Sequence, residues 1–230
     1  MTVRTRIKIC GITRVEDGLA AARAGADAIG LVFWRGTPRA VEFAAAREIA
    51  LALPPFVSVV GLFVDPSPGE VDAALAEVPL DALQFHGAEP PELCRRFRRP
   101  YLKAIAVKEA VDLLEYAARY GDAAGLLFDA YRDGDLPGGT GHTFDWSRLS
   151  ADVRARLPRP LVLSGGLDAA NVGRAIRELR PWAVDVSSGV EERGPDGKPR
   201  RGLKDAARIA AFVQGVRNAD GGSSERVRPA

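Results

Sequence analysis

The sequence predicts the α/β class and, within it, a single-domain (β/α)8 TIM barrel, because strand and helix signals alternate along the chain. Eight short apolar runs rich in β-branched and aromatic residues recur in 230 residues. A spacing of 23 residues recurs between strand ends, from Cys10 to Phe33, from Phe63 to His86 and from Ser164 to Ser187. Each interval has room for a right-handed crossover helix, and eight such units make a barrel.

The predicted strands are near-continuous apolar runs, as expected for strands covered on both faces. In chain order they are RIKIC (6–10), AIGLVF (28–33), VSVVGLF (57–63), ALQFH (82–86), YLKAIAV (101–107), GLLFD (125–129), PLVLS (160–164) and AVDVSS (183–188).

The segments between the strands are rich in Ala, Leu, Glu and Arg, with apolar residues at three- and four-residue steps, which is the helical period. Clear examples are 14–25, 42–53, 70–78 and 171–180. The competing fold is a doubly wound open sheet, which usually has fewer strands and a glycine-rich turn after the first one. The segment CGITRVEDG (10–18) has no such turn.

The barrel domain is predicted to span residues 1–217, and the polar, Gly/Ser-rich segment 218–230 is expected to be a disordered tail. The net charge of +2 gives no reason to expect a nucleic acid or a membrane as partner. Cys10 and Cys94 lack metal-site spacing, so no metal is expected, and whether they form a disulfide stays open. Without a signal-peptide pattern or a membrane-spanning run, the chain is predicted to be cytoplasmic.

Active sites of such barrels lie at the carboxyl ends of the strands, so polar residues there are the candidates. Side chains alternate along a strand, and with Ile7 and Ile9 facing the helices, Lys8 and Cys10 face the barrel interior. Asp129 ends its strand in the same way. A packed core thiol and a turn-capping carboxylate are the competing interpretations for Cys10 and Asp129.

Gln84 and His86 share one face of their strand, as do Asp185 and Ser187. His86 could instead be a hydrogen-bonded core residue. The first and eighth strands become neighbours when a barrel closes, so Lys8 and Asp185 are expected to form a structural ion pair in the interior.

Two glycine-rich turns predict a phosphate site. Gly165 and Gly166 follow the seventh strand, with Asp168 as the expected cap of the next helix, and Ser187, Ser188 and Gly189 follow the eighth, where a short extra helix could begin. Their N–H groups would converge on one anion. The alternative is two turns without a ligand. A third glycine-rich loop, 135–146, would cover the site, with Thr143 or Asp145 capping the helix after it.

Together the motifs KICGIT, GLVFW…TPR, LQFHG, GLLFDAY…GGTGHTFDW, LSGGL and VDVSSGVE closely resemble the phosphoribosylanthranilate isomerase family of tryptophan biosynthesis, from about residue 8 to about residue 212. The resemblance implies an Amadori rearrangement of phosphoribosylanthranilate without metal or organic cofactor, in a monomer or homodimer.

Carried over motif by motif, the resemblance makes Asp129 the general acid and Cys10 the general base. Arg39 would bind the anthranilate carboxylate. The remaining substrate contacts would come from Gln84, His86, Gly139 and Thr140, and the phosphate contacts from Gly165, Gly166, Ser187, Ser188 and Gly189. A thiol has a pKa near 8.5 and a carboxyl near 3.9, so Lys8 is expected to assist the thiol and burial to raise the pKa of Asp129.

Two other functions compete with this one. The first is an epimerase or aldolase acting on a sugar phosphate. An aldolase needs a Schiff-base lysine at an upper strand end, and Lys103 lies too early in its strand. The second is a barrel that binds a phosphorylated ligand without catalysis. Segment 191–205 is longer and more basic than the family's usual stretch, either as a solvated loop or touching the phosphate. His142 stands where a lysine is common and Ala130 where a small polar residue is frequent.

Overall fold

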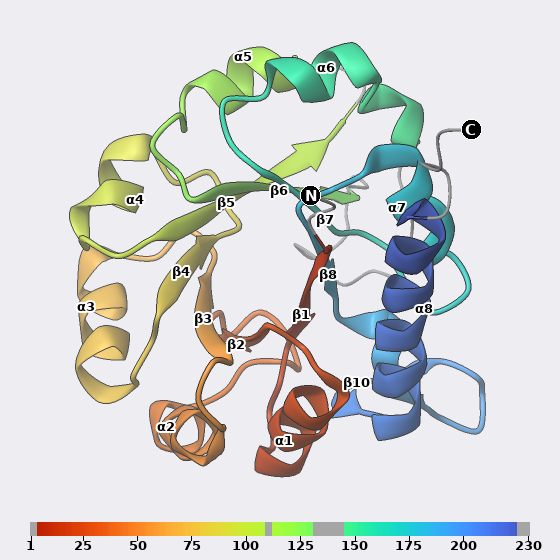
Figure 1. The fold of residues 1–230 in the computed structure, drawn as a ribbon. Helices are drawn as coiled ribbons and strands as arrows, with labels where there is room; N and C mark the ends of the chain where they lie inside the picture. The colour runs from red at the N-terminus through yellow and green to blue at the C-terminus, as the bar shows by residue number, and fades with distance from the viewer. Residues whose placement is uncertain (1–3, 109–111, 131–144, 225–230) are drawn as a thin grey trace, which may run out of the picture.

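In a computed structural model of the protein, which describes residues 4–108, 112–130 and 145–224, eight parallel strands close into a barrel in the order β1 to β8 (Figure 1). The strands are β1 (Arg6–Cys10), β2 (Ala28–Val32), β3 (Ser58–Phe63), β4 (Ala82–Phe85), β5 (Tyr101–Val107), β6 (Gly125–Ala130), β7 (Leu161–Leu163) and β8 (Ala183–Val186). The (β/α)8 prediction is confirmed.

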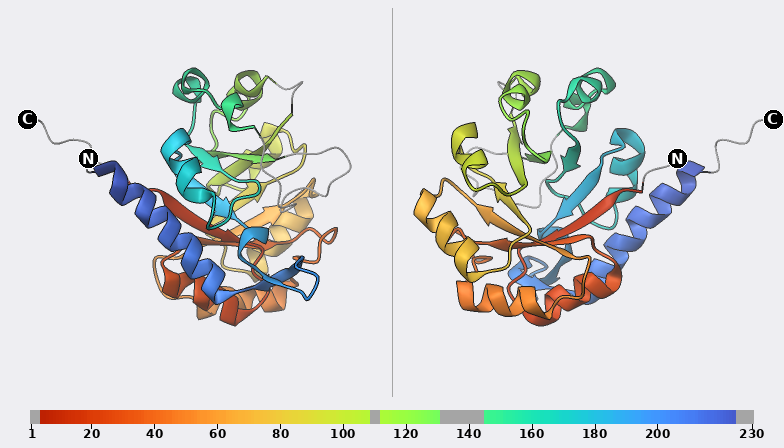
Figure 2. Two further views of the ribbon diagram at one scale, coloured as in Figure 1. Left: turned by 90° about the vertical axis from the view of Figure 1, so that its right-hand side faces the viewer. Right: turned by 60° about the vertical axis from the view of Figure 1, so that its left-hand side comes forward.

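The helices lie outside the strands, and α8 runs beside α1 and α7 (Figures 1 and 2). They are α1 (Val15–Ala24), α2 (Phe43–Ala52), α3 (Pro68–Glu77), α4 (Pro91–Arg96), α5 (Leu113–Ala118), α6 (Ala151–Arg156), α7 (Val172–Leu179) and α8 (Ala206–Ser224). Helix α3 begins earlier than the predicted 70–78 because Ser67 and Glu70 form a capping box around Pro68.

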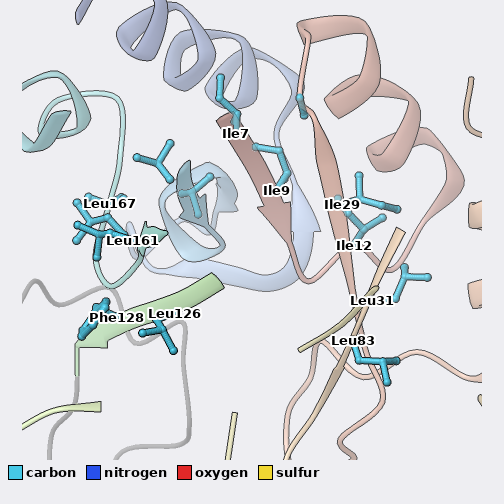
Figure 3. Packing of buried hydrophobic residues seen from close by; sticks show 14 of the residues in the cluster. Ile7, Ile9, Ile12, Ile29, Leu31, Leu83, Leu126, Phe128, Leu161 and Leu167 are labelled. Atoms are coloured by element: carbon cyan, nitrogen blue, oxygen red, sulfur yellow. The ribbon is translucent and has the colours of Figure 1, made fainter. Parts of the chain in front are cut away.

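Apolar side chains form two layers. The outer layer lies between strands and helices and includes Ile7 and Ile9 of β1 and Leu126 and Phe128 of β6 (Figure 3). A small inner layer fills the barrel with the buried residues Ala104, Leu127, Val162 and Ala183. The alternation expected for β1 and β6 is therefore correct, and it leaves the opposite face of each strand for the site.

The barrel closes between β1 and β8, where Lys8 is the register partner of Asp185. On the other side of β1, Cys10 is paired with Gly30 of β2. These two registers place the carboxyl ends of β1, β2 and β8 side by side at one mouth.

The C-terminal helix is longer than expected. Helix α8 continues through Ser224, so the predicted disorder is wrong for residues 218–224, and residues 225–230 lie outside the described ones. The last turns are anchored because Ala219 is buried and the Asp220 carboxylate accepts from the backbone N–H and the hydroxyl of Thr5, both at 2.8 Å.

Segment 191–205 forms a hairpin of β9 (Glu191–Arg193) and β10 (Pro199–Lys204), where the sequence left a plain loop as one alternative. The predicted cap of the sixth helix also shifts. Asp145 caps the 3₁₀ turn η1 (Trp146–Arg148), and Ser150 caps α6 itself. Thr143 lies outside the described residues. Within the described ranges, no helix has the length and apolar character needed to cross a membrane.

Candidate active site

Most of the predicted site residues line a single pocket at the carboxyl ends of the strands. The pocket is lined by Cys10, Arg39, Gln84, His86, Asp129, Gly165, Gly166, Ser187 and Ser188, together with Asp185 below them. Gly189 follows in the turn η2 (Ser188–Val190). Gly139, Thr140 and His142 lie outside the described residues. The closed barrel thus brings the carboxyl ends of seven strands together around one space.

Cys10 is buried at the end of β1, above an ion pair between Lys8 Nζ and Asp185 Oδ1 at 2.9 Å. Burial raises the pKa of the Cys10 thiol, and the nearby Lys8 ammonium only partly opposes the shift. Lys8 therefore lowers the pKa of Cys10, as expected, but burial raises that pKa by more. The predicted Lys8–Asp185 pair is confirmed. Gly11 follows with φ +74, a left-handed turn in which a Cβ would meet Arg39 Cδ at 2.7 Å.

An apolar wall flanks the thiol. Cys10 packs with Val32 and Leu62, and Trp34 packs against this small cluster. Trp34 and Thr37 also line the pocket, although the sequence alone assigned neither a role. A flat aromatic ring would find contact area here.

A chain of three polar side chains crosses the pocket. Gln84 Nε2 lies 3.0 Å from His86 Nδ1, and His86 Nε2 lies 3.1 Å from Asp129 Oδ2. Gln84 is completely buried, and its Oε1 has no hydrogen-bond partner among the described residues. His86 is therefore hydrogen-bonded, as its alternative interpretation expected. Its partner on the Nε2 side is Asp129, the predicted general acid.

Arg39 reaches the pocket from the loop after β2 and is held by a carboxylate that sequence reasoning missed. Its Nε and Nη2 donate to the two oxygens of Glu191, at 2.7 and 2.9 Å. Glu191 also accepts from Lys204 Nζ at 3.2 Å and from the Gly202 N–H at 2.9 Å. Burial alone would raise the pKa of Glu191, but Arg39 and Lys204 outweigh it and lower the pKa to about 2.

Lys204, at the end of β10, is fully buried and donates to the carbonyl oxygen and the hydroxyl of Ser187, at 3.1 and 3.3 Å. The basic segment therefore touches the turn after β8, for which the sequence predicts phosphate binding. Its burial and the Arg39 charge lower the pKa of Lys204, while Glu191 opposes the shift. The only signal in the sequence was position: Glu191 closes the VDVSSGVE motif, and Lys204 ends the basic segment.

The two glycine-rich turns are built for close backbone approach. Gly165 and Gly166 have φ of +84 and +62, and a Cβ at Gly189 would lie 2.0 Å from the Leu167 carbonyl oxygen. None of the described residues accepts a hydrogen bond from the N–H groups of Gly165, Gly166 or Gly189. Donors of this kind suit an anion.

Asp168 caps a turn rather than a helix, which corrects the expectation. Its Oδ1 accepts from Ala170 and Asn171, and α7 starts one residue later at Val172. Asn171 in turn donates to the Gly166 carbonyl oxygen at 2.8 Å, which fixes the first glycine turn.

Lys103 faces away from the pocket, toward the helices. It is fully buried, and its Nζ donates to Glu89 Oε2 and to the Gly87 carbonyl oxygen, both at 2.6 Å. A lysine committed in this way does not serve as a Schiff-base nucleophile, so the aldolase alternative loses its lysine. In the described parts of the chain, no three His, Cys, Asp or Glu residues are grouped to hold a metal ion.

Comparisons with known proteins agree with this geometry. The family model of N-(5′-phosphoribosyl)anthranilate (PRA) isomerase matches residues 7–215. N-(5′-phosphoribosyl)anthranilate isomerase of Alcanivorax borkumensis is 55% identical over 217 residues, which are 94% of this chain and 97% of that protein.

Solved structures give the same result. A crystal structure of phosphoribosyl anthranilate isomerase from Thermotoga maritima has a TM-score of 0.82 and 41% identity, and covers 93% of this chain and 99% of its own. Generated monomers of that dimeric enzyme have a TM-score of 0.78 with 40% identity over the same shares. A complex of such an enzyme with reduced 1-(o-carboxyphenylamino)-1-deoxyribulose 5-phosphate has a TM-score of 0.79 and 40% identity, again covering 93% and 99%.

Proposed function

The chain belongs to the N-(5′-phosphoribosyl)anthranilate isomerase family, and we propose that Cys10 and Asp129 perform the two proton transfers of its reaction. The protein isomerises phosphoribosylanthranilate to 1-(2-carboxyphenylamino)-1-deoxyribulose 5-phosphate in tryptophan biosynthesis. The observation that supports the proposed roles is that the thiol and the carboxyl, from β1 and β6, line one pocket whose rim is two glycine turns.

In the first step, Asp129 gives a proton to the furanose ring oxygen. The bond from that oxygen to C1′ breaks and its electron pair stays on the oxygen, which becomes a hydroxyl. The lone pair of the anthranilate nitrogen forms the C1′=N bond, so the product of this step is a protonated Schiff base. A positioned acid of this kind contributes about 10² to 10⁴ in rate.

In the second step, the Cys10 thiolate removes the C2′ proton. The electrons of the C–H bond form C1′=C2′, and the C=N electrons return to nitrogen, which gives a neutral enolamine. Loss of the enol proton and protonation at C1′ then complete the ketone. The apolar wall of Val32, Leu62 and Trp34 lies on the Cys10 side, where it fits the anthranilate ring.

The two anionic ends of the substrate would be recognised by different groups of the pocket. Arg39 would bind the anthranilate carboxylate while Glu191 holds its guanidinium in place. The phosphate would bind between the turn of Gly165 and Gly166 and the turn of Ser187, Ser188 and Gly189, with uncommitted N–H groups as donors.

The decisive experiment follows the loss of phosphoribosylanthranilate fluorescence with Cys10→Ser and Asp129→Asn. Both variants are expected to lose at least 10²-fold in kcat. Cys94→Ala is the matched control, because Cys94 is the other buried thiol and packs in the outer core, away from the pocket. A fully active Asp129→Asn enzyme would overturn the general-acid role.

We further propose a homodimer, for which the exposed residues near the start of β3 provide a surface. Phe56 is fully exposed and Leu51 is 66% exposed, and the Thermotoga relative is named as dimeric. Light scattering of wild type and Phe56→Ser tests this, and a monomeric wild type contradicts it. A cytoplasmic location is likewise proposed; both described cysteines are free thiols, and cell fractionation tests it.

A further inference from the structure

Gln84 has no access to solvent, and among the described residues its amide makes a hydrogen bond only to the ring of His86. A buried amide offers two donors and one acceptor, so satisfying it normally takes several partners. Here the carbonyl oxygen Oε1 has no donor among the described residues. A buried polar atom without a partner in a native structure calls for an explanation, and a catalytic role is one that is known.

The arrangement determines the proton positions on His86. Gln84 Nε2 carries hydrogens only, so at 3.0 Å it makes Nδ1 of His86 the acceptor. A neutral imidazole has one N–H, which must then be on Nε2, 3.1 Å from Asp129 Oδ2. Protonation of Nδ1 would place two N–H donors face to face.

The two oxygens of Asp129 thereby become different. Oδ2 accepts the His86 N–H, so a proton on the carboxyl sits on Oδ1. Oδ1 lies beside Gly165, where a Cβ would come within 3.0 Å of it. Gly165 leads into the proposed phosphate turn, so Oδ1 is the oxygen on the substrate side of the carboxyl.

We propose that Gln84 is a positioning residue that holds His86 as the neutral Nε2–H tautomer, so that His86 orients Asp129 and leaves Oδ1 as the acidic oxygen. This role replaces the direct substrate contact that the family resemblance implies for Gln84. It deepens the proposed function and rests on it, because it presumes that Asp129 is the general acid. His86 itself donates no proton to substrate.

The first test is spectroscopic. The chain has two histidines, so ¹⁵N-histidine labelling gives two ring systems, and a His142→Asn sample assigns those of His86. At pH 7.5 the substrate-free enzyme should show His86 with an unprotonated Nδ1 and a protonated Nε2. A protonated Nδ1 would overturn the proposal, because it would mean that Gln84 presents its carbonyl oxygen to the ring.

The second test is a pair of near-isosteric variants. Gln84→Met removes the donor and should lower kcat about tenfold with KM nearly unchanged, as the tautomers mix. Gln84→Glu places an acceptor opposite Nδ1, draws a proton onto it, and should lower kcat about 100-fold. Gln214→Met, in exposed surface of α8, is the matched control and should leave both constants unchanged. A Gln84→Glu enzyme more active than Gln84→Met would contradict the donor role.

Failure of the two proposals can be told apart. If Asp129→Asn stays active, Asp129 is not the general acid. The tautomer of His86 in the unmodified enzyme would still show whether Gln84 donates to its Nδ1. If Gln84→Glu does not fold, the spectrum of the unmodified enzyme still decides the matter.

Discussion

Lys8 and Asp185 form an ion pair across the seam that closes the barrel, with Nζ 2.9 Å from Oδ1 and both side chains about 5% exposed. Burial lowers the pKa of Lys8, but the charges of Asp185 and Cys10 outweigh it and the net shift is upward. The pair thus keeps the Lys8 ammonium charged below the thiol in the barrel interior.

Removing one partner of this pair should cost stability and activity together. Lys8→Met leaves the Asp185 carboxylate buried and unpaired, for which we expect a loss of about 3–5 kcal/mol in the free energy of unfolding. The pKa of Cys10 should rise further, so the rate at neutral pH should fall. Urea unfolding and steady-state kinetics measure the two effects. In the double variant Lys8→Met/Asp185→Leu, most of the stability should return but not the rate. Recovery of both would show that Lys8 does nothing for the thiol.

The raised pKa of Cys10 predicts slow alkylation at neutral pH. The thiolate is the reactive form, so the iodoacetamide rate should increase about tenfold per pH unit from pH 7 to 9. Cys94, whose pKa is raised to about 12 chiefly by burial, should react far more slowly. Mass spectrometry distinguishes the two sites, and product should protect Cys10. A rate that levels off below pH 8 would disagree with the raised pKa.

Gly30 should tolerate no side chain, because it lies against Cys10, the proposed base. A Cβ there would come within 2.7 Å of Cys10 Sγ and 3.0 Å of Lys8 Nζ. Gly30→Ala should therefore lower kcat at least tenfold by displacing the thiol. Gly69→Ala is the control: it has open space in α3 and should raise stability by about 0.5–1 kcal/mol with full activity. If Gly30→Ala were as active as Gly69→Ala, β1 could move to accept the methyl group without loss of kcat, and the prediction would be wrong.

Glu191 should stabilise the fold in a pH-dependent way. Its pKa falls from an ordinary 4.5 to about 2 in the folded protein. A depressed acid contributes stability that is present above 4.5 and is lost as the pH falls toward about 2. Glu191→Gln should lose about 3 kcal/mol at pH 7 and raise KM by loosening Arg39. In urea unfolding its deficit relative to wild type should shrink between pH 4.5 and 2. Glu192→Gln, beside it in a half-exposed pair with Arg200, should change stability by less than about 1 kcal/mol. A deficit that does not change with pH would contradict the assignment.

Strand alternation made much of this molecule predictable. Once Ile7 and Ile9 are assigned to the helix side, Cys10 must face the barrel, and the ring order makes Lys8 and Asp185 neighbours. What remained hidden is contact between segments far apart in the chain. The carboxylate that binds Arg39 comes from a hairpin some 150 residues later. No local sequence pattern indicates which carboxylate an arginine will contact over that separation.

The tail shows the same limit. The composition of residues 218–224 is typical of disorder, yet Asp220 meets Thr5 at the other end of the chain and the helix continues. Likewise, both Gln84 and His86 were placed on one strand face, but their link to Asp129 depends on the spacing across the barrel. Propensity is local, whereas these contacts exist only after closure.

The pairing of β1 with β8 has a consequence for synthesis on the ribosome. β1 is made first and its last partner comes only with residues 183–186, so one edge of the growing sheet stays open through most of translation. Until then, a strand with a free edge, ending in a thiol, is available to other chains. Helix α8, made last, then ties the first residues down through Thr5 and Asp220. The nascent chain thus needs protection for longest at β1, the strand that ends in Cys10.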